Sequence, residues 1–117
     1  MSRKIHKIVT RDSMAAMLSN PNPAYVQAVI GKALVAIFNR QTEDEKNIND
    51  VREHNTIGFS GADARTGSIT AKYFLKHKSL MPWQVEKWSK ISRGYPRICK
   101  YHKQLNEIAI TKEVNHV

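Results

Sequence analysis

The sequence predicts a mainly α-helical fold, a small single-domain helical bundle of about four to five helices with a glycine-rich ordered loop. Apolar residues recur every three or four positions in several segments, and prolines stand where helices would begin. Hydrophobic residues make up 41% of the 117 residues, which is enough to bury a core without disulfides. The one cysteine, Cys99, excludes an intramolecular disulfide. We expect residues 1–117 to form one domain.

The N-terminal third begins with a basic arm, residues 1–11, which is either extended or a short strand. Asp12 or Ser13 can cap a short helix that runs through Leu18. The prolines of segment 20–23 end this helix, because neither is tolerated in a helix interior.

The longest predicted helix begins at Pro23, after the capping residue Asn22, and runs to about Arg40. Its apolar residues follow one helical face, and we expect that face to be the centre of the core. The face consists of Val26, Ile30, Ala33, Leu34 and Ile37. A capping-box pattern at 42–45 then predicts either a second helix or a continuation of the first.

Residues 54–68 are typical of an ordered loop, because glycines supply turn positions with positive φ and apolar side chains can attach the loop to the core. The glycines are Gly58, Gly61 and Gly67, and the apolar residues are Ile57 and Phe59.

Three further helices are predicted at 68–77, 82–93 and from 96 to about 110, with a frayed tail at 111–117. Each has apolar residues three or four positions apart, which predicts an inward face. These are Ile69, Tyr73 and Phe74 in the first helix, Val85, Trp88 and Ile91 in the second, and Ile98, Tyr101, Leu105 and Ile108 in the third.

The net charge of +9 is confined to one segment of the chain. Residues 65–103 hold ten bases and one acid, Glu86, whereas the other 78 residues sum to zero. The bases are Arg65, Lys72, Lys76, Lys78, Lys87, Lys90, Arg93, Arg97, Lys100 and Lys103. A charge gathered in this way requires an anionic partner or an internal acidic counterpart, and the backbone of DNA or RNA is the obvious partner.

We predict that one exposed basic surface, to which three helices each contribute a pair of bases, binds nucleic acid with little sequence preference. Aromatic side chains among these lysines and arginines can stack on unpaired nucleobases of the ligand. The predicted contact residues are Lys72, Lys76, Lys87, Lys90, Arg93, Arg97, Lys100, Lys103, Trp83 and Tyr95. An alternative is a helix-turn-helix in which 82–92 is the recognition helix, with Trp83, Gln84 and Lys87 near its leading end.

No pattern in the sequence predicts catalysis, a metal or a cofactor. Cys99 and His102 lie three residues apart, but two ligands are too few for a metal site. A magnesium site would have to use acids whose spacing matches no motif, and for which capping and solvation are the simpler roles. These acids are Glu43, Glu45, Asp50, Glu53 and Asp63. We therefore expect a protein that is not an enzyme.

Several short segments together resemble a group of small bacteriophage and mobile-element proteins, mostly without assigned activity. The segments are Asn39-Arg40-Gln41-Thr42 with Glu45, His54-Asn55, Gly58-Phe59, Gly61-Ala62-Asp63-Ala64, Leu80-Met81-Pro82 with Gln84, and Lys100-Tyr101 with Gln104-Leu105 and Ile108-Ala109. The resemblance covers roughly residues 33–109 and implies that the glycine-rich loop and the Leu-x-Pro helix start share one site or core. Met81 departs from the usual small polar residue, and no catalytic residues are implied.

Two functions compete at this point. The first is a phage-type accessory protein that contacts nucleic-acid phosphates through residues 65–103. The second is a phage anti-defence inhibitor, for example of a CRISPR or other host nuclease complex, that acts by binding protein. The N-terminus lacks the pattern of a signal peptide, and no apolar run is long enough to span a membrane. We expect a cytoplasmic protein, in the host cell if it is phage-encoded.

Overall fold

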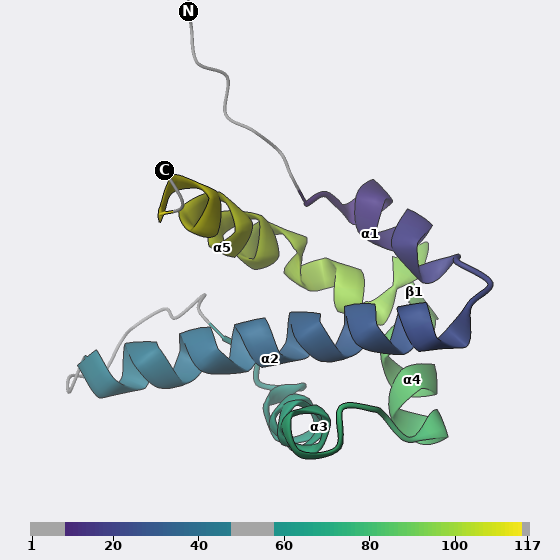
Figure 1. Cartoon of the computed structure of the whole chain (residues 1–117), viewed down its shortest axis with the longest axis horizontal. Helices are drawn as coiled ribbons and strands as arrows, with labels where there is room; N and C mark the ends of the chain where they lie inside the picture. Colours follow the sequence, from purple (N-terminus) through teal and green to yellow (C-terminus); the bar gives the residue numbers. More distant parts are fainter. Residues whose placement is uncertain (1–8, 48–57, 116–117) are drawn as a thin grey trace, which may run out of the picture.

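A computed structural model describes the backbone of residues 9–47 and 58–115, and the side chains of residues 9–42 and 58–110. The described part is mainly helical, as the sequence predicts (Figure 1). Its elements are α1 (Arg11–Leu18), α2 (Pro23–Asn47), α3 (Ala64–His77), α4 (Pro82–Ser89), β1 (Ile91–Ser92), β2 (Tyr95–Pro96), the 3-10 helix η1 (Arg97–Tyr101) and α5 (His102–Asn115). Helix α2 lies across the middle, with α1 and α5 on one side and α3 and α4 on the other.

Helix α2 is continuous through residues 42–45, so of the two predicted alternatives the continuation is correct. Thr42 does not cap a new helix, because its hydroxyl donates to the backbone carbonyl of Asn39 at 3.0 Å inside α2. The predicted inward face is also confirmed, since all of its residues are buried except the half-buried Ala33.

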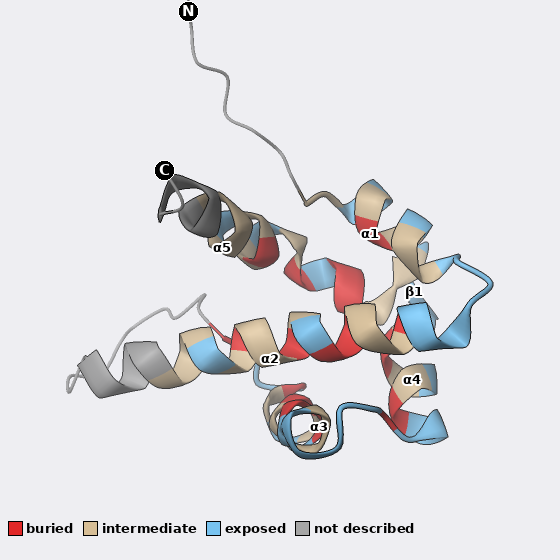
Figure 2. Ribbon diagram, in the orientation of Figure 1, coloured by how far each residue is buried: buried red, intermediate tan, exposed pale blue. Residues whose placement is uncertain are grey.

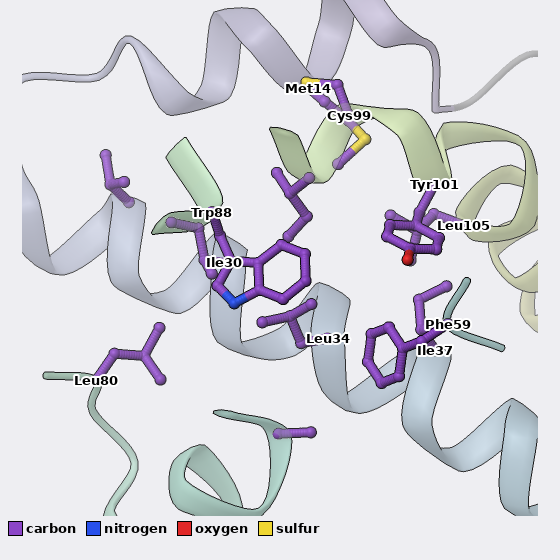
Figure 3. Close-up of a cluster of buried hydrophobic side chains, with 13 residues drawn as sticks. Met14, Ile30, Leu34, Ile37, Phe59, Leu80, Trp88, Cys99, Tyr101 and Leu105 are labelled. Carbon is purple, nitrogen blue, oxygen red and sulfur yellow. The ribbon is translucent and has the colours of Figure 1, made fainter. Parts of the chain in front are cut away.

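The core gathers around this face of α2, and Figure 2 marks the buried residues of α2, α3 and α5 in red. Trp88 of α4 lies beside Ile30 and Leu34, and Phe59 lies beside Ile37 (Figure 3). The rings of Phe59 and Tyr101 meet edge to face, with centroids 5.7 Å apart. Helices far apart in the sequence are thus joined by a cluster of large apolar side chains.

Two glycines let aromatic rings reach the backbone of the core helices. A Cβ on Gly31 of α2 would collide with the ring of Phe74, and one on Gly67 of α3 would lie 2.6 Å from the ring of Phe59. Gly67 is therefore a packing position inside a helix, not the predicted turn. Of the three loop glycines only Gly58 has a positive φ, +94°. Phe59 is buried as predicted, whereas Ile57 lies outside the described residues.

Helix α1 is capped by Thr10 instead of Asp12 or Ser13. The Thr10 hydroxyl accepts the Ser13 amide at 3.0 Å, and the Ser13 hydroxyl accepts the Thr10 amide at 2.9 Å. Of the predicted arm or strand, residues 1–8 lie outside the described residues, and Val9 and Thr10 lead directly into α1 without forming a strand.

The second half of the chain departs from prediction after α4. This helix ends at Ser89, and a two-stranded antiparallel hairpin, with Ile91 opposite Pro96, stands where we expected helix up to Gly94. Arg93 and Gly94 form its turn with φ of 56° and 88°, a pair that fits the twist of a tight hairpin. Ile91 is consequently exposed instead of inward.

The other predicted inward residues are buried or half-buried except Ile69 of α3, which is exposed. The last predicted helix is divided into η1 and α5, and α5 remains helical to Asn115, inside the predicted tail, of which 116–117 lie outside the described residues. None of the helices described has the length and apolar character needed to cross a membrane.

Candidate nucleic-acid interface

Asp63, at the start of α3, is a fully buried carboxylate that holds two of the predicted contact residues. Its Oδ1 accepts from Arg97 Nη2 at 2.5 Å and Nε at 3.1 Å, and its Oδ2 lies 2.8 Å from Lys100 Nζ. The Tyr101 hydroxyl donates to Oδ2 at 2.7 Å. Burial alone would raise the pKa of Asp63, but the hydrogen bonds from Lys100, Arg97 and Tyr101 outweigh it and lower the pKa to about 2.

The loop that carries Asp63 is fastened by side chains from α2, η1 and α5. Gln104 accepts the Gly58 amide at 2.8 Å and donates to the Gly58 carbonyl at 3.0 Å. Gln41 accepts the Phe59 amide at 2.9 Å, and Tyr101 Oη accepts the amide of Ser60 at 3.0 Å. Burial raises the pKa of Tyr101 to about 12, so this hydroxyl stays protonated. Residues from several segments of the phage-protein resemblance therefore meet at this loop.

These contacts correct the role expected for Asp63, which is neither solvated nor a cap, because it makes no side-chain capping bond to α3. Its oxygens are occupied by cations and a phenol, which disfavours the magnesium alternative. The other candidate acids, Glu43, Glu45, Asp50 and Glu53, have side chains outside the described residues. Within the described part of the chain, no three residues among His, Cys, Asp and Glu gather as a metal site would require. Burial raises the pKa of Cys99, which is a core thiol.

Two neighbouring hollows of about 430 and 490 Å³ share the lining residues Ser92 and Arg97. The first is lined by Trp83, Glu86, Lys87, Lys90, Ile91, Ser92 and Arg97. The second is lined by Arg11, Ser92, Arg93, Tyr95, Pro96, Arg97 and Lys100. We call the two hollows together the basic groove, because their described lining includes six bases and one acid.

The cations of the basic groove are positioned by the core beneath them. The ring centroid of the buried Trp88 lies 5.8 Å from Lys87 Nζ and 5.9 Å from the guanidinium carbon of Arg97. The Arg97 amide donates to the carbonyl of Lys90 at 2.8 Å, which closes the base of the hairpin. The groove is thus built on α4, the hairpin and η1, with Arg11 from α1, and Lys87, Arg97 and Lys100 are held by contacts within the protein.

Arg93 occupies the tip of the hairpin in a left-handed conformation, with φ of 56°. This conformation is unfavourable for a residue with a Cβ, and tight hairpin turns usually place Asn, Asp or Gly there. Arg93 lines the second hollow, so the strained residue is also one of its cations. Such local strain is found at binding sites more often than elsewhere.

The two predicted aromatic contacts differ in their surroundings. Trp83 lines the first hollow and is 46% exposed. Tyr95 lines the second, but its hydroxyl donates to Asp12 at 2.7 Å and its ring faces the guanidinium of Arg11 at 5.3 Å. The hydrogen bond to Asp12 raises the pKa of Tyr95. Tyr95 therefore ties the hairpin to α1, and Trp83 is the aromatic side chain that the groove offers to a ligand.

The structure does not bring all of the predicted contact residues to this groove. Lys72 and Lys76 are exposed on α3 and line neither hollow, and the ammonium of Lys72 lies 5.7 Å from the centre of the Phe38 ring. Lys103, exposed at the start of α5, also lines neither. Conversely, Arg11 belongs to the groove although sequence reasoning missed it. Only the basic character of the N-terminal segment could have suggested it.

The structure contains the two helices and the turn of the helix-turn-helix alternative, but one of the three expected contact residues is buried. Gln84, expected near the leading end of a recognition helix, is buried, and its Oε1 accepts the Met81 amide at 2.8 Å. This bond is the reciprocal half of a capping box, in which the N3 side chain accepts the amide of the N-cap residue. Held in this way, the Gln84 side chain cannot reach a base edge. Both α3 and α4 pack on α2, and α4 ends at Ser89.

Comparison with protein-family models, with curated proteins and with solved structures finds no match to this chain.

Proposed function

We propose that this chain is a small accessory protein that binds nucleic acid by its phosphates, with little sequence preference, in the basic groove. The observation that carries the proposal is a pair of neighbouring hollows that share Ser92 and Arg97 and whose described lining has six bases and one acid. Asp63 neutralises part of the charge of Arg97 and Lys100. If it is counted with the lining, six bases and two acids give the groove a net charge of +4. A phosphodiester backbone is the common polyanion that runs continuously through two adjacent sites.

The kinds of side chain in the groove favour phosphate contact over sequence reading. Lysine and arginine dominate, and Gln84, an amide that could read base edges, is buried. Arg97 is pre-ordered by Asp63 and Trp88, so less side-chain entropy is lost when a phosphate binds. Binding would therefore depend on charge and on the shape of the groove.

The resemblance over residues 33–109 supports a phage or mobile-element origin, and with it action in the host cytoplasm. The pairing of Asp63 with Arg97, Lys100 and Tyr101 supports a binding protein over a metal-dependent nuclease, because it removes a candidate ligand from the surface.

Fluorescence anisotropy with labelled single- and double-stranded DNA and RNA tests this function. Four phosphate contacts predict an affinity loss of roughly 50- to 150-fold between 50 and 200 mM salt. Replacing the acid of the groove, Glu86→Gln, should tighten binding, since it removes a repulsive charge. Absence of binding in low salt, or binding that ignores salt, would overturn the proposal. Either result would favour the protein-binding inhibitor.

A further inference from the structure

The basic groove combines phosphate-binding cations with an exposed indole, which suggests the form of the nucleic acid it takes. We infer that the ligand is a single strand and that one of its bases stacks on Trp83 in the first hollow. This inference rests on the proposed function and specifies its substrate class.

Trp83 is placed as a ligand-contacting residue and not as part of the core. It lies in the first turn of α4 and is 46% exposed, whereas Trp88 of the same helix is fully buried. Lys87 follows it by four positions, on the same side of α4, and Lys90 comes directly after the end of the helix. All three line the first hollow. Ile91, 62% exposed, extends the apolar part of that lining.

An indole surrounded by cations suits a base whose face is uncovered. Stacking on an aromatic side chain is largely independent of sequence, because every base has a π-face. In a duplex the faces are covered by neighbouring base pairs, and placing one on Trp83 would require unpairing and unstacking it. A single strand offers its bases without that cost.

The second hollow continues the path for the backbone. It meets the first at Ser92 and Arg97 and adds the bases Arg11, Arg93 and Lys100. The two volumes, about 430 and 490 Å³, lie within the range of sites that hold ligands of nucleotide size. A strand can therefore pass from Trp83 across Arg97 toward the hairpin tip, with its phosphates on the cations.

Tryptophan fluorescence tests the stacking directly, because Trp83 and Trp88 are the two tryptophans of the chain. Oligo-dT, oligo-U and a duplex of equal length are titrated into wild type, Trp83→Phe and Trp83→Ala. We expect single strands, of DNA, RNA or both, to quench wild-type emission and to bind more tightly than the duplex. Trp83→Phe should lose the quenching but keep most of the affinity, since phenylalanine also stacks and Trp88 remains as the internal control.

Trp83→Ala should weaken single-strand binding by roughly 5- to 150-fold and leave duplex binding nearly unchanged. A duplex that binds as tightly as a single strand, an absence of quenching, or an equal loss of affinity for both would overturn the inference. Salt-dependent duplex binding without quenching would leave the proposed function standing. If none of the three ligands binds, both the proposed function and this inference are wrong. Thermal melts of the variants should match wild type, because the side chain lies outside the core.

Discussion

The basic segment of the chain is divided into two groups of cations with different surroundings. The lysines of the α3 region, Lys72, Lys76 and Lys78, are exposed and line neither hollow. The cations of the basic groove converge on two hollows, with Arg97 and Lys100 paired to a buried carboxylate and Lys87 placed over a buried indole. Charge alone therefore does not define the candidate site. The candidate site is distinguished by cations that line a concave surface, next to exposed apolar side chains.

We expect the largest difference between the two groups of cations in the stability of variants that disturb them. Asp63→Asn should lower the free energy of unfolding by roughly 2–4 kcal/mol, because it removes the buried partner of two cations. The estimate is at the lower end for a broken buried pair, since Arg97 and Lys100 are partly exposed. In the α3 group, Lys72→Met should change stability by less than about 0.5 kcal/mol. Urea denaturation measures both, and equal effects would contradict the anchoring of the groove.

Charge reversal in the two groups of cations should also have different effects on the affinity for nucleic acid. Reversing the groove pair with Lys87→Glu and Lys90→Glu should weaken binding on the order of 100-fold in low salt. The matched reversal on α3, Lys72→Glu with Lys76→Glu, changes the net charge equally and should cost less than about 10-fold, through long-range repulsion alone. Anisotropy in one buffer compares the two variants. If the α3 reversal proved as damaging, the surface would extend over both groups.

The pH dependence of stability should identify Asp63 as the anchor. Its pKa is lowered from 3.8 to about 2 in the folded state, so folding favours the ionised form. The resulting stabilisation, about 2 kcal/mol, is present above about pH 4 and is lost as the pH falls toward 2. Stability curves for wild type and Asp63→Asn should therefore converge over this range. Parallel curves would show that the carboxylate titrates normally.

The smallest effect should come from the hairpin tip. Arg93→Gly relieves the left-handed strain and should raise stability by about 1 kcal/mol, while removal of one cation weakens binding several-fold. Arg93→Lys, the matched control, keeps both charge and strain and should resemble wild type in both measurements. If Arg93→Gly is more stable and binds with unchanged affinity, Arg93 does not contact the ligand.

The sequence predicted the parts of the fold that depend on local periodicity. The inward face of α2 and the core positions Trp88, Ile98, Tyr101 and Leu105 follow from helical spacing. The hairpin was missed because two-residue strands are too short to show alternation, and because Arg93-Gly94 is not one of the common turn pairs. The same lack of a strand pattern explains why helical spacing predicts an inward Ile91, which is exposed.

The candidate site was only partly predictable, because it depends on contacts between distant segments. Helical spacing predicts that Lys87 and Lys90 lie together, and both line the first hollow. It does not predict that Lys72 lines neither hollow. The pairing of Asp63 with Arg97 joins residues 34 positions apart. Arg11 comes to the groove only because α1 packs against the hairpin and η1. Such juxtapositions come from tertiary packing, which no local pattern reports.

Lysine footprinting gives the most direct test that the basic groove is the nucleic-acid interface. The protein is acetylated briefly with and without a saturating oligonucleotide in low salt, and modification at each lysine is quantified by mass spectrometry. The groove account predicts that the ligand protects Lys87, Lys90 and Lys100, while Lys72, Lys76 and Lys78 react as before. Protection centred on the α3 lysines, or unchanged reactivity at Lys87 and Lys90 in the bound protein, would contradict it.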